Sequence, residues 1–385
     1  MTIDILCKVV DNFGDIGVVY RLARALSELD GHYGLRLIVD DLGAFRALDP
    51  SVDPSKPVQA LHGWTVVRWD EAWEGFRAER PRIVLECFAC GRPDWYEDIL
   101  FDPTDRERRT ILSVEHLTAE AWAPDFHRLA SATRSGLVRK WMFMPGFQAG
   151  TGGLVAEAGL AARLEAWRRG PDRPELRRAL ARASGLNLPR GAEGHSWLTV
   201  FSYERDYGRI VAELSAFARD RPLLVLVAAG RSAPCFAEAW RRAGEPFPVL
   251  MLPFLRQEAW DELLMASDFA IVRGEDSLAR AALYGLPFLW HAYLQEGAHQ
   301  VVKVRALMDR MRPHFASAVF AAYEAMSIAF NDRLVDGPDT RGEESILPLL
   351  GSGASMGPGF AAFSAEILGL GNLAANLVTF LGEIV

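Results

Sequence analysis

Residues 3–17 read IDILCKVVDNFGDIG. The apolar run Ile3–Val10 is typical of a buried strand, and the turn after it contains Gly14 and Gly17, which let the backbone bend tightly and approach a ligand closely. Beyond Gly17, apolar side chains recur at the spacing of one helix face. We therefore expect a strand, a ligand-binding turn and a helix, which is the opening unit of an α/β fold.

Strand-like runs alternate with helix-like segments through most of the chain, the pattern of α/β proteins with mainly parallel sheets. In the first half the expected strands are Ile3–Val10, Leu35–Val39, Thr65–Val67, Ile83–Cys87, Thr110–Val114 and Trp141–Met144. In the second half they are Trp197–Tyr203, Leu223–Val227, Pro248–Leu252, Phe269–Val272 and Leu286–Trp290. The two series predict two doubly wound, Rossmann-like domains whose loops would line a cleft between them.

The domain boundary is expected in the arginine-rich segment Leu164–Pro189, where Gly and Pro residues interrupt a helical pattern. We expect a first domain over residues 1–165 and a second over 166–371. A final amphipathic helix, 372–385, could pack back on the first domain. The glycine- and proline-rich stretch Val335–Gly359 breaks the pattern and is expected to be a mobile excursion.

Composition limits the classes of partner. The 385 residues are 50% hydrophobic and carry a formal net charge of −8, which argues against nucleic acid as the main partner. The amino terminus shows no secretion signal, and no apolar run reaches the ~18 residues that a membrane span needs. We expect a cytoplasmic protein that does not enter a membrane.

The four cysteines do not suggest a metal site. Cys87 and Cys90 form a C-x-x-C pair, but no second pair follows at zinc-binding spacing. The pair ends an apolar run, so buried core thiols are the favoured interpretation and a redox pair the alternative. His116, His291 and His299 also lack a metal-binding arrangement, and we expect no metal.

The first candidate site is the acidic turn after the opening strand. It carries Asp11 and Asp15, with Phe13 and Gly14 between them, near the carboxyl end of that strand. Two carboxylates in a βα loop suit catalysis or the binding of a cation. Alternatively, one of them only caps the following helix.

The second candidate site follows a strand that ends at Val272. The sequence there runs Arg273, Gly274, Glu275, Asp276 and Ser277, with a helix expected to start at Asp276 or Ser277. The free N–H groups of a helix start suit a diphosphate, and the glutamate would then face sugar hydroxyls. An ordinary capping cluster is the alternative.

Two further segments fit a nucleotide pocket in the second half. Phe201, Ser202 and Tyr203 end its first strand, and Phe254 and Gln257 follow its third. An aromatic ring can stack on a base for ~1–3 kcal/mol, glutamine can read a base edge, and the hydroxyls can bind phosphate. Each residue could equally be part of the core or a cap.

Taken together, the motifs resemble a known family. They are DNFGDIGV (11–18), PGF (145–147), TGGL (151–154), FSY (201–203), PFxxQ (253–257) and RGEDS (273–277). Their order and spacing closely resemble those of the bacterial elongation factor P arginine rhamnosyltransferases, the EarP family. The resemblance spans roughly residues 3–305 and recurs in the last helix; it departs at His116, where an aromatic residue is expected after Glu115.

The resemblance implies a GT-B fold, dTDP-β-L-rhamnose as donor, an arginine of elongation factor P as acceptor, inversion at the anomeric carbon, and no cofactor or metal. By position, Asp15 matches the catalytic base, Asp11 its neighbouring acid, and Glu275 the acid that holds the donor sugar. Nucleotide and diphosphate contacts are implied for Tyr203, Phe254, Gln257, Arg273, Asp276 and Ser277. A GT-B transferase or epimerase acting on a small molecule, and a non-catalytic module that binds elongation factor P, are the competing hypotheses.

Overall fold

The computed structural model describes residues 2–10, 13–29, 33–169, 173–332 and 345–385. The chain forms two compact units. Unit 1 comprises residues 1–158 and 370–385, and unit 2 comprises residues 159–369. The expected boundary at residue 165 falls inside helix α6 (Leu160–Arg169), which belongs to unit 2.

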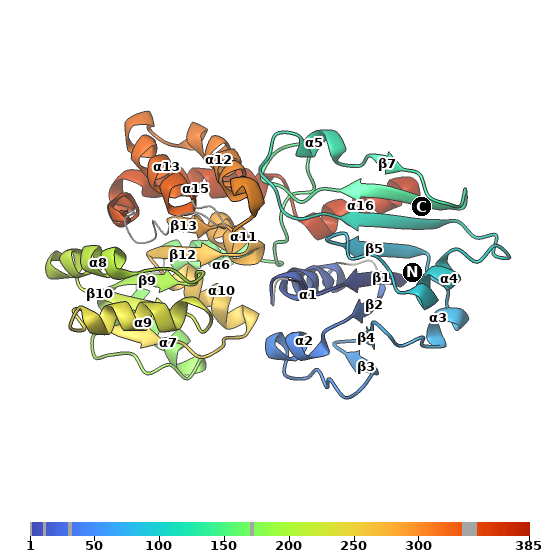
Figure 1. The fold of residues 1–385 in the computed structure, drawn as a ribbon, viewed down its shortest axis with the longest axis horizontal. Helices are drawn as coiled ribbons and strands as arrows, with labels where there is room; N and C mark the ends of the chain where they lie inside the picture. Colours follow the sequence, from blue (N-terminus) through green and yellow to red (C-terminus); the bar gives the residue numbers. More distant parts are fainter. Residues whose placement is uncertain (1, 11–12, 30–32, 170–172, 333–344) are drawn as a thin grey trace. The chain divides into compact units, whose positions relative to one another are not determined.

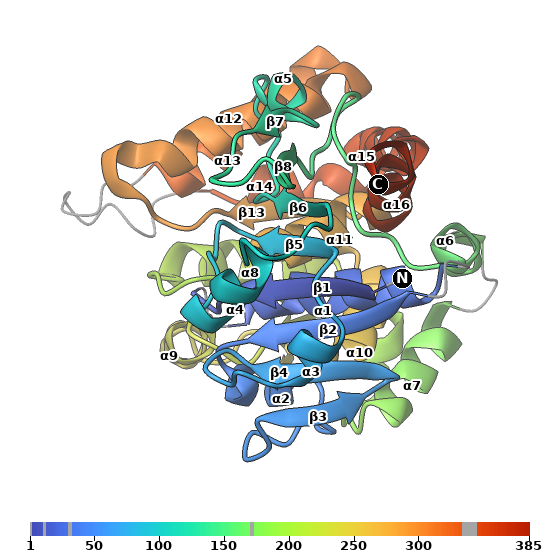
Figure 2. The same ribbon diagram turned by 90° about the vertical axis from the view of Figure 1, so that its right-hand side faces the viewer.

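In the described part of unit 1, eight strands form one sheet in the order β3-β4-β2-β1-β5-β6-β8-β7 (Figure 2). All neighbours are parallel except β3–β4 and β7–β8. The strands are β1 (Thr2–Cys7), β2 (Gly34–Val39), β3 (Val58–Leu61), β4 (Trp64–Arg68), β5 (Ile83–Cys87), β6 (Arg109–Val114), β7 (Ala130–Ser131) and β8 (Val138–Phe143).

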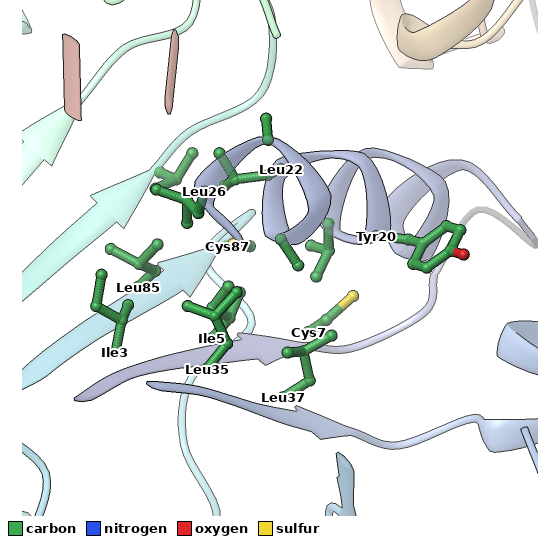
Figure 3. Close-up of a cluster of buried hydrophobic side chains, with 14 of the residues drawn as sticks. Ile3, Ile5, Cys7, Tyr20, Leu22, Leu26, Leu35, Leu37, Leu85 and Cys87 are labelled. Carbon is green, nitrogen blue, oxygen red and sulfur yellow. The ribbon is translucent and has the colours of Figure 1, made fainter. Parts of the chain in front are cut away.

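Helix α1 covers one face of this sheet. The helices of unit 1 are α1 (Gly14–Ser27), α2 (Leu42–Leu48), α3 (Gly75–Ala78), α4 (Asp94–Leu100), α5 (Ala123–Phe126) and α16 (Leu373–Ile384). Leu22 and Leu26 of α1 pack on a core that includes Ile5 of β1 and Leu85 of β5 (Figure 3). The apolar stripe of the sequence is therefore the buried face of α1.

Both ends of the opening βα turn differ slightly from expectation. Strand β1 ends at Cys7 rather than Val10, and α1 begins at Gly14 rather than near Gly17. Val10 is 88% exposed, and its backbone N–H bonds to the Asp15 carboxylate instead of to a neighbouring strand. The turn thus takes its hydrogen bonds from side chains, which an apolar pattern does not reveal.

The carboxyl-terminal helix α16 belongs to unit 1. In Figure 1 its ribbon lies with those of unit 1. Its buried side chains, among them Leu377 and Phe380, belong to the same core as those of α1. At the first residue of the helix, the Leu373 N–H donates to the Leu154 carbonyl at 2.9 Å. Residues at the two ends of unit 1 therefore share one core.

Unit 2 contains a second parallel sheet. In its described part the order is β11-β10-β9-β12-β13. The strands are β9 (Ser196–Val200), β10 (Leu223–Val227), β11 (Val249–Met251), β12 (Phe269–Arg273) and β13 (Phe288–His291). The helices are α6, α7 (Arg173–Ala183), α8 (Gly208–Asp220), α9 (Ser232–Arg242), α10 (Gln257–Ala266), α11 (Glu275–Tyr284), α12 (His299–Met311), α13 (Ser317–Asn331), α14 (Leu347–Leu350) and α15 (Ser352–Gly369).

The expectation of a mobile excursion over Val335–Gly359 was wrong for the part of this stretch that the structure describes. Residues 347–350 form α14, and α15 begins at Ser352 despite its glycines and Pro358. Leu349, Leu350 and Met356 are at most 2% exposed, so burial of apolar side chains overrides the low helix propensity of the segment. Residues 335–344 lie outside the described residues.

In each sheet the strand order reverses at one point. In unit 1 the chain proceeds outward from β1 in one direction and from β5 in the other; in unit 2 the corresponding pair is β9 and β12. Ligands of open α/β sheets bind beyond the carboxyl ends of the strands at such switch points. The loops after these four strands are therefore the candidate positions for the active site.

None of the described helices combines the length and apolarity that a membrane crossing requires.

Candidate active site

Asp15 stands at the switch point of unit 1. It lies in the first turn of α1 and is 8% exposed. Its Oδ2 atom accepts a hydrogen bond of 2.7 Å from the Val10 backbone N–H, so the carboxylate ties the β1 loop to the helix start. Phe13 is the N-cap residue, and its ring is partly buried against the core. Asp11 lies outside the described residues.

The loop after β5 borders the same switch point and was missed by the sequence analysis. Phe88 and Ala89 both have a left-handed backbone, with φ of 58° and 50°. Such conformations cost free energy in residues other than glycine and are concentrated at functional sites. The Phe88 ring stacks on His116, which follows β6, at a centroid distance of 4.8 Å. The only signal in the sequence was that both residues follow a strand.

Charged groups also gather at the end of β5. Glu86 is 5% exposed, pairs with Arg92, and lies 3.4 Å from the Lys140 ammonium group. The nearby thiols are not reactive nucleophiles, because burial raises the pKa of Cys87 well above its ordinary value and the pKa of Cys90 to about 12. Cys87 is a buried free thiol, as expected for a core residue.

The RGEDS motif occupies the switch point of unit 2. Strand β12 ends at Arg273, Gly274 is the N-cap, and α11 begins at Glu275, one residue before the expected start. Gly274 has φ 67° and ψ 171°, a conformation that is essentially restricted to glycine. Glu275 and Asp276 are half-buried in the first helical turn. The turn therefore combines the amino-terminal N–H groups of a helix with two carboxylates.

Arg273 is a buried cation that contacts two aromatic rings. Its guanidinium carbon lies 4.7 Å from the ring centroid of Phe201 and 4.6 Å from that of Tyr203 (both follow β9). The side chain is 8% exposed, and among the described residues its Nε atom has no hydrogen-bond partner. Stacking fixes the plane of the guanidinium and leaves a donor for an anion.

Ser202 brings an unexpected partner into the site. It is fully buried, and its hydroxyl lies 2.7 Å from Nδ1 of His291, the last residue of β13. The Tyr203 backbone N–H also points to this Nδ1, at 3.4 Å. Because a backbone N–H can only donate, Nδ1 acts as the acceptor and the imidazole proton sits on Nε2. In the sequence, the position of His291 at the end of an expected strand could have indicated that it belongs to this site.

The remaining candidates follow β11, on the carboxyl-end edge of the same sheet. Phe254 is 45% exposed, whereas Gln257, the first residue of α10, is 5% exposed. Helix α10 is tied to α11, since the Trp260 indole N–H donates to the Ser277 hydroxyl at 3.2 Å. Among the described residues, no group of three or more His, Cys, Asp or Glu side chains is arranged to hold a metal ion.

Comparison with known proteins identifies the family. Residues 3–382 match the family described as the elongation factor P (EF-P) rhamnosyltransferase EarP. The chain belongs to the EarP family. A protein-arginine rhamnosyltransferase from Pseudomonas putida KT2440 is 36% identical over 342 residues, which cover 86% of this chain and 86% of that protein. One from Neisseria meningitidis serogroup B is 32% identical over 342 residues, which cover 85% of this chain and 83% of that protein.

A solved structure shares the fold. The structure described as the structural basis for EarP-mediated arginine glycosylation of translation elongation factor EF-P covers 100% of this chain and 99% of that one, with a TM-score of 0.60 and 24% identity. This EarP family member therefore has a GT-B fold and is a protein-arginine rhamnosyltransferase whose acceptor is an arginine of EF-P. The small-molecule and non-catalytic hypotheses are set aside by the family match.

Proposed function

We propose that this EarP family member transfers L-rhamnose from dTDP-β-L-rhamnose to the EF-P arginine with inversion, and that Asp15 is its general base. One observation carries the proposal: Asp15 and the Arg273–Ser277 turn each lie at the switch point of a parallel sheet. In proteins of this architecture, such points bind ligands.

Arginine is a difficult acceptor because its guanidinium, with a pKa above ~12, stays protonated and is a poor nucleophile. A carboxylate such as Asp15 binds the guanidinium and accepts one of its protons as the new bond forms. The C1–N bond to the arginine forms while the C1–O bond to the diphosphate breaks, and dTDP leaves with the electron pair. The Val10 N–H bond keeps Asp15 oriented for this step. Asp11 serves as the second acid that holds the guanidinium.

Unit 2 takes the donor in this proposal. The N–H groups at the start of α11, Asp276, the Ser277 hydroxyl and the Arg273 guanidinium contact the diphosphate and offset the charge that develops on dTDP. Glu275 binds hydroxyl groups of the sugar. The Phe254 ring, which is 45% exposed, stacks on the thymine base.

The other candidates complete the donor site. Gln257 contacts the base edge, and Phe201, Ser202 and Tyr203 position Arg273 and the phosphates. Phe13 and Gly14 border the sugar from the turn that presents Asp15. We place the reaction in the cytoplasm, because the acceptor is a translation factor.

The test is a donor panel. Purified enzyme and EF-P are incubated with dTDP-β-L-rhamnose or, separately, with UDP- and dTDP-hexoses, and the intact mass of EF-P is followed. We expect one deoxyhexose on EF-P and one dTDP released per transfer, only with the rhamnose donor, and an α-linkage by NMR of the glycopeptide. An EF-P variant that lacks the acceptor arginine controls for specificity. A β-linkage would refute inversion, and equal use of another donor would refute the donor assignment.

A further inference from the structure

An exposed apolar surface follows β6 in unit 1. Trp122, Phe126 and Leu129 are 43%, 46% and 50% exposed, and we call them the α5 patch. The two aromatic rings contact each other edge to face, 5.5 Å apart. Exposed aromatic side chains in one cluster are characteristic of protein-binding surfaces, since water solvates them poorly.

The backbone beneath the patch is firmly held. Ala123, inside α5, is fully buried, and the Gln148 side-chain amide donates to the Glu120 carbonyl at 3.0 Å. The Arg128 N–H donates to the Met142 carbonyl at 2.8 Å. The exposed rings are therefore displayed by a fixed segment, which lowers the entropy lost on binding.

The patch lies on the same edge of the sheet as Asp15. It follows the carboxyl end of β6, and the Asp15 turn follows the carboxyl end of β1; both strands flank β5 in parallel (Figure 2). The Leu129 carbonyl accepts a hydrogen bond from the Met142 N–H, and Met142 lies one residue before the carboxyl end of β8. This contact also places the patch at the carboxyl-end edge of the sheet. Val10, 88% exposed, adds a further apolar side chain beside the Asp15 turn.

The charge of this segment suits an arginine-bearing partner. Residues 115–129 contain three acids, Glu115, Glu120 and Asp125, and one cation, Arg128, which pairs with Glu383. Carboxylates attract a cationic surface, and aromatic faces bind guanidinium groups by stacking. The acceptor of this family is a protein that must bring an arginine to the enzyme.

We propose that the α5 patch is the surface on which EF-P docks while its arginine reaches Asp15. The inference rests on the proposed role of Asp15, which places the acceptor at this edge of the sheet. It assigns to Trp122, Phe126 and Leu129 the recognition of the protein surface around the arginine, and no part in the chemistry. The departure from the family pattern at His116 falls in the loop that leads to the patch.

The experiment compares Trp122→Ala, Phe126→Ala and the double variant with Leu347→Ala, a matched control because Leu347 is 53% exposed in unit 2. We expect the KM for EF-P to rise at least ~10-fold in the double variant, as for aromatic hot-spot residues. The kcat at saturating EF-P, the Kd for dTDP measured by calorimetry and the unfolding midpoint should stay within about twofold of wild type.

Direct binding separates docking from catalysis. EF-P should bind the Asp15→Asn enzyme in calorimetry, and this binding should weaken when Trp122→Ala is added. An unchanged KM for EF-P in the double variant overturns the docking proposal, and so does a fall in kcat without a change in KM. If sedimentation shows that the variants only dissociate a wild-type dimer, the patch serves a second copy and the proposal is also wrong. A fully active Asp15→Asn enzyme would instead refute the catalytic role of Asp15. The KM and binding data for the α5 patch variants would still test the docking proposal.

Discussion

Asp15 organises the loop that follows β1. One of its carboxylate oxygens accepts the Val10 N–H, and an ionised carboxylate is an acceptor-only group with two oxygens. Asp40 offers a natural comparison, because its Oδ1 accepts the adjacent Val9 N–H at 2.8 Å from the end of β2. The two aspartates thus hold the same loop from two sides, and only Asp15 stands in the α1 turn.

We predict that Asp15→Asn lowers kcat at least ~10²-fold, the usual scale for loss of an acid–base group, because asparagine keeps the loop bond but cannot take a proton. The Kd for dTDP should change little. Asp40→Asn is the matched control and should remain active. Rates are measured by intact mass of EF-P; equal losses in both variants would mean that the loop geometry, and not proton transfer, is responsible.

We predict that the contribution of Arg273 to dTDP binding depends on the planar shape of its guanidinium group. Lysine keeps the charge but lacks the planar group that lies over the rings of Phe201 and Tyr203, and it cannot form a bidentate contact with phosphate. Arg273→Lys should therefore raise the Kd for dTDP by roughly 10-fold or more, measured by calorimetry. Arg128→Lys, which removes a similar stack on Phe380 in unit 1, should leave the Kd unchanged. Tight dTDP binding by Arg273→Lys would show that charge alone suffices.

At the scale of single elements, the central strands were predictable because each is an uninterrupted apolar run. The predicted limits of Ile83–Cys87 and Leu223–Val227 are those of β5 and β10. The missed strands, β3 and β7, lie at the two edges of the unit 1 sheet. The β7 side chains are exposed and most of those of β3 are exposed or only partly buried, so no apolar run is required. Antiparallel pairing at these edges leaves no comparable trace in the sequence.

His127, which precedes β7, should make the free energy of unfolding depend on pH. The Met144 N–H donates to Nδ1 of His127 at 3.1 Å, and burial together with nearby Arg128 lowers the pKa of His127 to about 4. The unfolded chain, with a histidine pKa near ~6.5, binds this proton more readily. The stabilising contribution is therefore complete above pH ~6.5 and is lost as the pH falls toward 4.

Urea unfolding at a series of pH values tests this. The free energy of unfolding of the wild type should fall more steeply between pH 6.5 and pH 4.5 than that of His127→Gln, whose amide oxygen can still accept the Met144 N–H. At pH 7.5 the two proteins should differ by about 1 kcal/mol or less. Parallel pH profiles would show that His127 is protonated equally in both states.

At the scale of the whole molecule, the last helix completes the first unit. Phe380 of α16 is 4% exposed and contacts the ring of Trp141 at 5.5 Å, from strand β8. Its neighbours in the core come from the beginning of the chain. The core of unit 1 is therefore complete only when α16 has been synthesised.

Phe380→Ala should destabilise unit 1 by about 3–5 kcal/mol, the usual loss for removing a buried aromatic side chain. Thr379→Ala is the control, because Thr379 is exposed and bonds only within its own helix. Urea denaturation followed by tryptophan fluorescence measures both. A loss of less than about 1 kcal/mol for Phe380→Ala would mean that α16 contributes little to the folded core.

The sequence by itself determined the alternation of strands and helices, the two βα turns with their acids, and the family, because these features depend on side-chain periodicity and local turn chemistry. Only the tertiary structure decided which loops are neighbours. Parallel strands are joined by crossovers, so adjacent strands such as β9 and β12 are distant in sequence. For this reason the contact of Ser202 with His291, the Phe88–His116 stack, and the common edge of Asp15 and Trp122 could not be derived from the order of residues.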